Sequence, residues 1–399
     1  MKHLPAFSAT PSQHARAVHL VQSYISSTTQ STDARPRAHA LYAFHPPRTA
    51  VHGTVVLFHG LASTPEIMRP TMTYFHNAGF NVYTPPGAGH AFAAHRLPYT
   101  LLKPEIGDKA REVILSDHVL ADYFQRITTA AAMEPPHAEE YAQIIARIKA
   151  RLRDQLSSAD FETVICALYA LSGNTYRPGL ESEIARYCES DYSRYESHPF
   201  ERVADVAPLP GPISVVGYSL GAVQAINLVA RAKFIHKLVL LAPFVGLRSQ
   251  PTGIDLAALG ALELFTLPFP ISTISARHFA ATSVAARMVH RAEIVAPIRR
   301  NVTTFCATAE LDEYCDPKGV TEYCQRELGN EQTKLFVYPK HTGLGHGIHP
   351  HSENKLAVPL LQEMLRFIQN GEVQLNKLLC VTGDEELPAV DSKSLQIIL

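Results

Sequence analysis

Short apolar runs, rich in β-branched residues, recur along most of this chain. Their length and composition are typical of strands that are buried on both faces of a sheet. Seven runs are predicted as strands: His39–Phe44, Thr54–Phe58, Phe80–Tyr83, Ile213–Gly217, Lys237–Leu241, Val302–Ala307 and Leu335–Tyr338. Helix-like patterns separate most of them, and this alternation predicts an α/β fold with a mostly parallel sheet and helices on both of its faces.

Apolar residues spaced three and four positions apart predict the helices. The clearest patterns lie at Thr64–Ala78, Ala222–Lys233 and Glu353–Asn370. The pattern does not decide the structure of the N-terminal segment to about Pro36, in which Ala15–Ser27 could form a short helix. Pro359 falls inside the last of the long patterns. Because proline disrupts a helix interior, this helix is predicted either to start later or to kink.

The alternating pattern is interrupted between about residue 90 and residue 212, where no run predicts a strand. Helical patterns at Glu112–Thr128 and Ala138–Leu156 are followed by Asn174–Tyr195. The Gly, Pro and Ser content of this last segment predicts irregular structure.

We expect two parts from this pattern: a core of residues 1–90 and 200–399, and a helical insertion of residues 91–199 that caps the open end of the sheet. The alternative is one long excursion packed on the side of the core. A second unusual stretch, Leu256–Ala276, is largely apolar and long enough for a membrane span. Two prolines and a glutamate within it argue against a span, so we predict a buried helix or an apolar lid and no transmembrane segment.

Composition and charge narrow the function classes. The chain has 399 residues, of which 46% are hydrophobic and 18% charged, and its formal net charge is −1. A charge so close to zero provides no field that attracts nucleic acid or an anionic membrane. The six cysteines lack C-x-x-C and zinc-like spacings, which favours free thiols in a reducing compartment. Met1–Pro5 carries no apolar run of the secretory type, so a cytoplasmic location is predicted.

One sequence motif indicates a candidate catalytic residue. The sequence Gly217-Tyr218-Ser219-Leu220-Gly221 follows a predicted strand and precedes a predicted helix. At a sharp strand-to-helix turn, Gly-x-Ser-x-Gly exposes the serine hydroxyl at the open end of a sheet, and the glycines allow strand and helix to approach closely. Ser219 is therefore the candidate nucleophile.

A serine nucleophile needs a base, and the base needs an acid that orients it. The acid is expected after the strand Val302–Ala307, where the chain reads Thr308-Ala309-Glu310-Leu311-Asp312-Glu313-Tyr314-Cys315-Asp316. Asp312 is the preferred candidate because the loop leaves the carboxyl end of the strand there. Glu310 and Asp316 are the alternatives.

The base is expected after the strand Leu335–Tyr338, in a segment that contains four histidines. His346 stands between Gly345 and Gly347 shortly before the last helix, so it is the preferred base, and His341 is the alternative. Clustered histidines can also bind a metal ion, although no acid or cysteine lies beside them in the sequence to complete such a site.

Acyl transfer to serine also requires hydrogen-bond donors for the oxyanion. The backbone N–H of Leu220, directly after the candidate nucleophile, is one expected donor. The strand Thr54–Phe58 runs into His59-Gly60-Leu61, and the N–H of Leu61 is the expected second donor.

The chain resembles the α/β-hydrolases of the monoacylglycerol-lipase and carboxylesterase type. The matching segments are His59-Gly60-Leu61, Pro86-Gly87-Ala88-Gly89-His90, the Gly217–Gly221 turn, Leu311-Asp312 and Gly345-His346-Gly347. The resemblance covers about half the chain and implies an eight-stranded, mostly parallel sheet and a Ser–Asp–His triad of Ser219, Asp312 and His346. The long separation of Gly89 from Gly217 departs from the family where substrate selectivity is usually built.

The resemblance implies a serine hydrolase that cleaves a carboxylic ester, thioester or amide through an acyl-enzyme, with neither cofactor nor metal. A small-molecule acyl ester is the expected substrate, and the apolar side chains of Leu256–Ala276 suggest a medium-chain or aromatic acyl group. Dehalogenases and epoxide hydrolases of the superfamily carry aspartate at the turn, so Ser219 argues against both. An acyltransferase with the same triad and a non-catalytic binding protein on the same scaffold are the alternatives.

Overall fold

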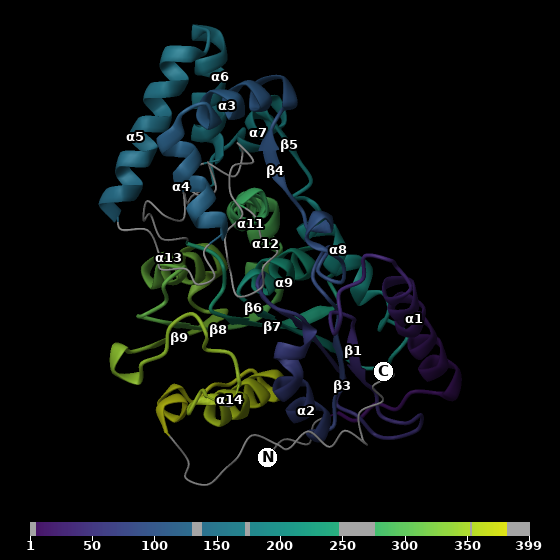
Figure 1. The fold of residues 1–399 in the computed structure, drawn as a ribbon. Helices are drawn as coiled ribbons and strands as arrows, with labels where there is room; N and C mark the ends of the chain where they lie inside the picture. The colour runs from purple at the N-terminus through teal and green to yellow at the C-terminus, as the bar shows by residue number, and fades with distance from the viewer. Residues whose placement is uncertain (1–4, 130–137, 172–175, 247–275, 352, 381–399) are drawn as a thin grey trace. The chain divides into compact units, whose positions relative to one another are not determined.

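The chain divides into two compact units. A computed structural model describes residues 5–129, 138–171, 176–246, 276–351 and 353–380. Of these, the first unit takes the described parts of residues 1–96, 195–246 and 289–399, and the second takes those of 97–194 and 276–288. Figure 1 shows the elements of both units.

The first unit is built on a seven-stranded sheet with the order β1-β3-β2-β6-β7-β8-β9. Its strands are β1 (Leu41–Ala43), β2 (Thr54–Phe58), β3 (Asn81–Thr84), β6 (Ile213–Tyr218), β7 (Ile235–Leu241), β8 (Thr303–Ala309) and β9 (Thr333–Tyr338). Only β1 pairs antiparallel with its neighbour, and all the other pairs are parallel. The prediction of an α/β fold with a mostly parallel sheet is confirmed.

The strand count is where the sheet departs from the expectation. The resemblance implied eight strands, and the described part of the chain places seven in this sheet. Before β1 the described chain forms a helix, α1 (Pro11–Thr29). Thr10 caps that helix by accepting a hydrogen bond from the N–H of Gln13.

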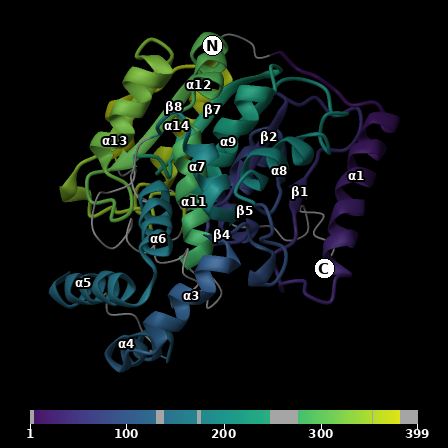
Figure 2. The ribbon, with the colours of Figure 1, turned by 90° about the horizontal axis from the view of Figure 1, so that it is seen from above.

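Helices cover both faces of the sheet (Figure 1). Apolar side chains of α2 (Arg69–Asn77) and α14 (Ala357–Asn370) join the strands in one buried cluster on one face. On the other face, α9 (Leu220–Arg231) packs against β6 and β7, and α12 (Ala292–Asn301) lies beside α9, as Figure 2 also shows. This unit also contains α8 (Arg194–Val203), which contacts α1 through Arg202 over the ring of Tyr24, and α13 (Pro317–Glu322), which is followed by a π-helix, η3 (Tyr323–Gly329).

Two predicted helices of this unit begin later than the sequence pattern suggested. The first turns of Thr64–Ala78 form a 3₁₀ helix, η1 (Pro65–Met68), before α2 begins. The pattern at Glu353–Asn370 becomes helical only at Ala357. Pro359 therefore lies in the first turn of α14, where a backbone N–H has no partner within the helix, so the helix starts late and does not need to kink.

The second unit is mainly helical. It contains α3 (Pro104–Leu115), α4 (His118–Thr129), α5 (Ala138–Gln155), α6 (Ser158–Leu171), α7 (Leu180–Tyr187) and α11 (Ala276–Met288). The limits differ from the predicted insertion because α11 belongs to this unit: Val284 and Met288 lie in its apolar cluster, and the buried Arg287 donates hydrogen bonds to the carbonyls of Ala170 and Leu171. That the insertion caps the sheet stays a prediction.

Three details of the second unit correct the sequence analysis. The single helix predicted at Glu112–Thr128 is two helices, because Asp117 accepts hydrogen bonds from the N–H groups of Val119 and Leu120 and so starts α4. A short antiparallel pair, β4 (Thr100–Leu102) and β5 (Cys188–Ser190), lies where no strand was predicted. Strands this short carry too few residues to show a periodic pattern. Part of Asn174–Tyr195, the segment predicted to be irregular, forms α7.

The apolar stretch at Leu256–Ala276 lies outside the described residues, apart from Ala276 at the start of α11. Among the helices that the structure describes, none combines the length and apolar character that crossing a bilayer requires.

Candidate active site

The sheet brings the candidate residues together at one edge. Because β2, β6, β8 and β9 are parallel, their carboxyl ends lie at the same edge. Ser219 directly follows β6, and Gly60, Asp312 and His346 lie in the chain segments after β2, β8 and β9. Residues separated by more than a hundred positions in the sequence therefore lie next to one another.

Ser219 occupies the sharp turn between β6 and α9. Its backbone has φ 55° and ψ −121°, a conformation that costs a non-glycine residue about 1–3 kcal/mol. A Cβ on Gly217 would lie 2.4 Å from the carbonyl oxygen of Gly221, and one on Gly221 would lie 2.2 Å from the carbonyl oxygen of Phe58. Gly217 is therefore needed for β6 to approach the start of α9, and Gly221 for α9 to approach the end of β2.

We expect the change Gly217→Ala to lower the free energy of unfolding by about 1–3 kcal/mol or more, because the new methyl group overlaps the backbone of α9. The measurement is urea unfolding of the variant beside wild type. Gly347→Ala is the matched control, since a Cβ there meets no atom within 4 Å. Equal stability of the Gly217→Ala variant and wild type would contradict the prediction.

Ser219, His346 and Asp312 form one hydrogen-bonded chain. Oγ of Ser219 lies 2.8 Å from Nε2 of His346, and Nδ1 of His346 lies 2.9 Å from Oδ2 of Asp312. The three side chains are buried, Asp312 completely and the other two nearly so. A carboxylate can only accept, so Nδ1 carries a proton, and the neutral ring therefore presents an unprotonated Nε2 to the serine hydroxyl.

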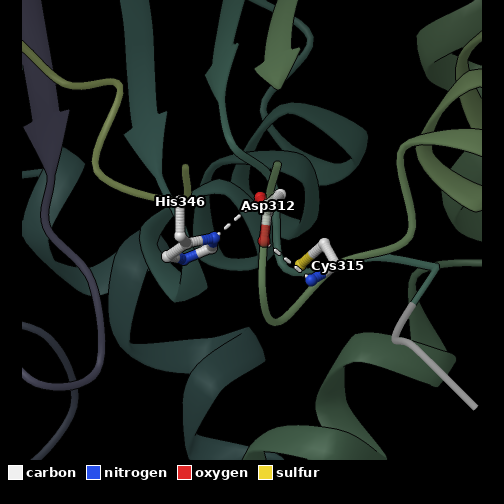
Figure 3. Close-up of side chains that lie close together, drawn as sticks. All are labelled: Asp312, Cys315 and His346. Carbon is white, nitrogen blue, oxygen red and sulfur yellow. Dashed lines mark hydrogen bonds and ion pairs between the residues drawn. The ribbon is translucent and has the colours of Figure 1, made fainter. Parts of the chain in front are cut away.

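The second oxygen of Asp312 is held by the backbone of its own loop. Oδ1 accepts hydrogen bonds from the N–H groups of Tyr314 at 2.9 Å and Cys315 at 2.8 Å. The carboxylate is thereby fixed with Oδ2 toward His346. Figure 3 shows the side chain between His346 and the backbone nitrogen of Cys315.

The alternatives named from the sequence have other partners. Glu310 is exposed and accepts a hydrogen bond from the N–H of Lys340. Asp316 caps α13 through the N–H of Lys318. His341 is exposed in a short 3₁₀ segment after β9. None of these three joins the chain of hydrogen bonds to Ser219.

Three residues that contact His346, namely Glu313, Tyr218 and Tyr314, were not predicted from the sequence. Oε2 of Glu313 accepts the backbone N–H of His346 at 3.0 Å, and a Cβ on Gly345 would lie 2.7 Å from the same oxygen. The rings of Tyr218 and Tyr314 lie 5.7 and 5.1 Å from the His346 ring, centroid to centroid. Tyr218 and Glu313 each adjoin a candidate residue in sequence, but residue type alone does not reveal these contacts.

Cys315 adds a possible metal ligand. Its sulfur, a carboxylate oxygen of Asp312 and a ring nitrogen of His346 all lie within 4.8 Å of one another (Figure 3). Cysteine, aspartate and histidine are zinc ligands. In this arrangement, however, Nδ1 of His346 donates a hydrogen bond to Oδ2 of Asp312, and Oδ1 already accepts two backbone hydrogen bonds. The donor set therefore fits the hydrogen-bonded chain better than it fits a metal.

The loop after β2 passes directly beside the serine. A Cβ on Gly60 would lie 3.1 Å from Cβ and 3.5 Å from Oγ of Ser219. Leu61 follows in this loop, and Leu220 is the first residue of α9. That both residues donate to an oxyanion stays a prediction.

His90 follows β3 and contacts the same loop. Its Nε2 is 3.0 Å from the carbonyl oxygen of Leu61, and the residue has no exposed surface. Burial lowers its pKa from 6.5 to about 4. Between these two pH values an unfolded chain binds a proton on this ring and the folded chain does not.

His90 is therefore expected to make stability depend on pH. Its contribution is complete above about pH 6.5 and is lost by about 1.4 kcal/mol per unit as the pH falls toward 4. The change His90→Gln should make the fall in unfolding free energy shallower by that amount. Urea unfolding at several pH values between 7 and 4.5 measures the two slopes, and equal slopes would contradict the prediction.

The mostly parallel sheet and the strained serine turn after β6 agree with the α/β-hydrolase fold that the resemblance implied. No protein-family model matches the chain, and no curated protein matches it in sequence. Several similar solved structures are those of lipases and esterases. A monoglyceride lipase of Saccharomyces cerevisiae is 13% identical with a TM-score of 0.45, over 86% of this chain and 98% of its own.

Two further similar structures are those of a lipase and an esterase. A monoacylglycerol lipase of Paleococcus ferrophilus is 13% identical with a TM-score of 0.43, over 84% of this chain and 99% of its own. A carboxylesterase of Bacillus subtilis is 13% identical with a TM-score of 0.36, over 90% and 100%. Because the sequence identities and TM-scores are low, the geometry of the site has to carry the functional inference.

Proposed function

We propose that this protein is a serine hydrolase that cleaves a carboxylic ester, or a thioester or amide, through an acyl-enzyme. The observation that carries the proposal is the hydrogen-bonded chain from Ser219 through His346 to Asp312. This chain has the arrangement that nucleophilic catalysis needs. The serine hydroxyl faces Nε2, the ring nitrogen that can accept its proton, and the carboxylate faces Nδ1, the ring nitrogen that donates to it.

In the proposed reaction, Oγ of Ser219 attacks the acyl carbonyl and its proton passes to Nε2 of His346. Asp312 orients the ring and stabilises the imidazolium. The N–H groups of Leu61 and Leu220 bind the oxyanion. His346 then protonates the leaving alcohol, thiol or amine, and water repeats the sequence to release the acid and restore the serine.

Labelling with a fluorophosphonate tests the proposal first. The reagent forms a stable phosphonyl ester with an activated serine, so we expect one adduct, located on Ser219 by peptide mass spectrometry. A set of p-nitrophenyl esters of increasing acyl length then tests the expected preference for a medium-chain or aromatic acyl group. Folded protein that neither reacts with the label nor hydrolyses any ester would overturn the proposal and favour a binding protein.

The products of the reaction distinguish acyl transfer from hydrolysis at the same site. With an alcohol or amine acceptor added, a hydrolase releases mainly the free acid, and a transferase releases mainly the new ester or amide.

A further inference from the structure

Two buried histidines lie beside the candidate site and take no part in the proposed proton transfer. His59 follows β2 and His90 follows β3. Both rings are almost completely buried and meet edge to face, with centroids 5.1 Å apart. Buried ring nitrogens need hydrogen-bond partners, and here the backbone of the two loops provides them.

The hydrogen bonds of His59 fix its tautomer. The backbone N–H of Gly87 points to Nε2 of His59, with the two nitrogens 2.9 Å apart. Because a backbone N–H can only donate, Nε2 carries no proton, and the neutral ring has its proton on Nδ1. Nδ1 therefore donates to the carbonyl oxygen of Gly60 at 2.8 Å. Burial, together with the neighbouring His90, holds the pKa of His59 well below its usual value, so the ring stays neutral.

The acceptor of this bond belongs to the peptide that carries the Leu61 N–H. In a planar trans peptide the carbonyl and the N–H point in opposite directions. The Gly60 oxygen is held by His59 and by the hydroxyl of Ser63 at 3.0 Å. Fixing this oxygen therefore fixes the direction of the Leu61 N–H in a loop that passes beside Ser219.

We propose that His59 is a positioning residue of the oxyanion hole: by donating from Nδ1 to the Gly60 oxygen, it holds the Leu61 N–H toward the oxyanion formed at Ser219. The inference rests on the proposed function, because it concerns the second oxyanion donor of that reaction. Gly87, from the loop after β3, sets the tautomer that makes the donation possible.

Two variants separate the two ring nitrogens. The amide nitrogen introduced by His59→Asn can take the place of Nδ1 and donate to the Gly60 oxygen. The amide oxygen introduced by His59→Gln can take the place of Nε2 and accept from Gly87, but the bond from Nδ1 to the Gly60 oxygen is lost and only the Ser63 hydroxyl still donates there. We expect His59→Gln to lower kcat for ester hydrolysis by about 10²–10³-fold, the typical effect of losing one oxyanion donor, and His59→Asn to retain most of it.

A transition-state analogue distinguishes positioning from a structural role. The inhibition constant of a boronic acid, which forms a tetrahedral adduct with the serine, should rise in the His59→Gln variant in proportion to the loss of kcat/KM, while KM stays nearly unchanged. Thermal unfolding of both variants shows whether they are folded. Equal losses in both variants, or full kcat in His59→Gln, would overturn the inference and leave the proposed function intact.

A measurement on the wild-type protein tests the inference even if the variants fail to fold. Nitrogen-15 NMR of wild-type protein labelled at histidine should show a protonated Nδ1 and an unprotonated Nε2 for His59 at neutral pH. The opposite tautomer would overturn the inference whether or not esters are hydrolysed. If wild type itself shows neither fluorophosphonate labelling nor ester hydrolysis, the proposed function fails and the positioning role falls with it.

Discussion

The change Ser219→Ala is expected to lower kcat for ester hydrolysis by about 10⁴–10⁶-fold. It removes the only atom that attacks the acyl carbonyl in the proposed reaction, and it leaves Nε2 of His346 without the hydroxyl that now lies 2.8 Å away. Since alanine keeps the Cβ, the strained turn at this position is unchanged. The measurement is steady-state hydrolysis of the best ester from the chain-length set.

Ser214→Ala is the matched control for this change. It also removes one buried serine hydroxyl, but Ser214 lies in β6 at the opposite end of the strand from the turn. We expect the control to keep kcat and to react with the fluorophosphonate. Ester hydrolysis that survives in the Ser219→Ala variant would show that another residue is the nucleophile.

The change Asp312→Asn is expected to lower kcat by about 10⁴-fold, because it reverses the tautomer of the base. The N–H groups of Tyr314 and Cys315 both require an acceptor at the Oδ1 position. The new amide must therefore place its oxygen there and its NH₂ toward Nδ1 of His346. Nδ1 then accepts, the proton moves to Nε2, and the ring can no longer take the proton of Ser219.

Two further variants serve as controls for the acid. Asp316→Asn should leave kcat close to wild type, because asparagine also caps a helix well and Asp316 caps α13. Glu310→Gln should do the same, since Glu310 is exposed. A larger loss from either control than from Asp312→Asn would move the acid to that position.

Local signals in the sequence were strong where a buried parallel strand leaves an unbroken apolar run. All seven predicted strands of the main sheet appear, and Thr54–Phe58 has the limits that its pattern indicated. The turn at Ser219 was also predictable, because its chemistry is local: two glycines are needed to bring one strand and one helix together. Predictions were weaker in the second unit, where Asp117 divides one apparent helix and two very short strands pair across a long sequence separation.

The sequence by itself determined the class of fold, the position of the candidate nucleophile and a short set of candidate acids and bases. Only the tertiary structure decided among these candidates, because Asp312 and Asp316 differ little as sequence but only Asp312 faces His346. It also placed Glu313 against the backbone of His346 and His59 against Gly60 and Gly87. The physical reason is that a hydrogen bond depends on where parallel strands end relative to one another, and a one-dimensional pattern of residue types does not contain that distance.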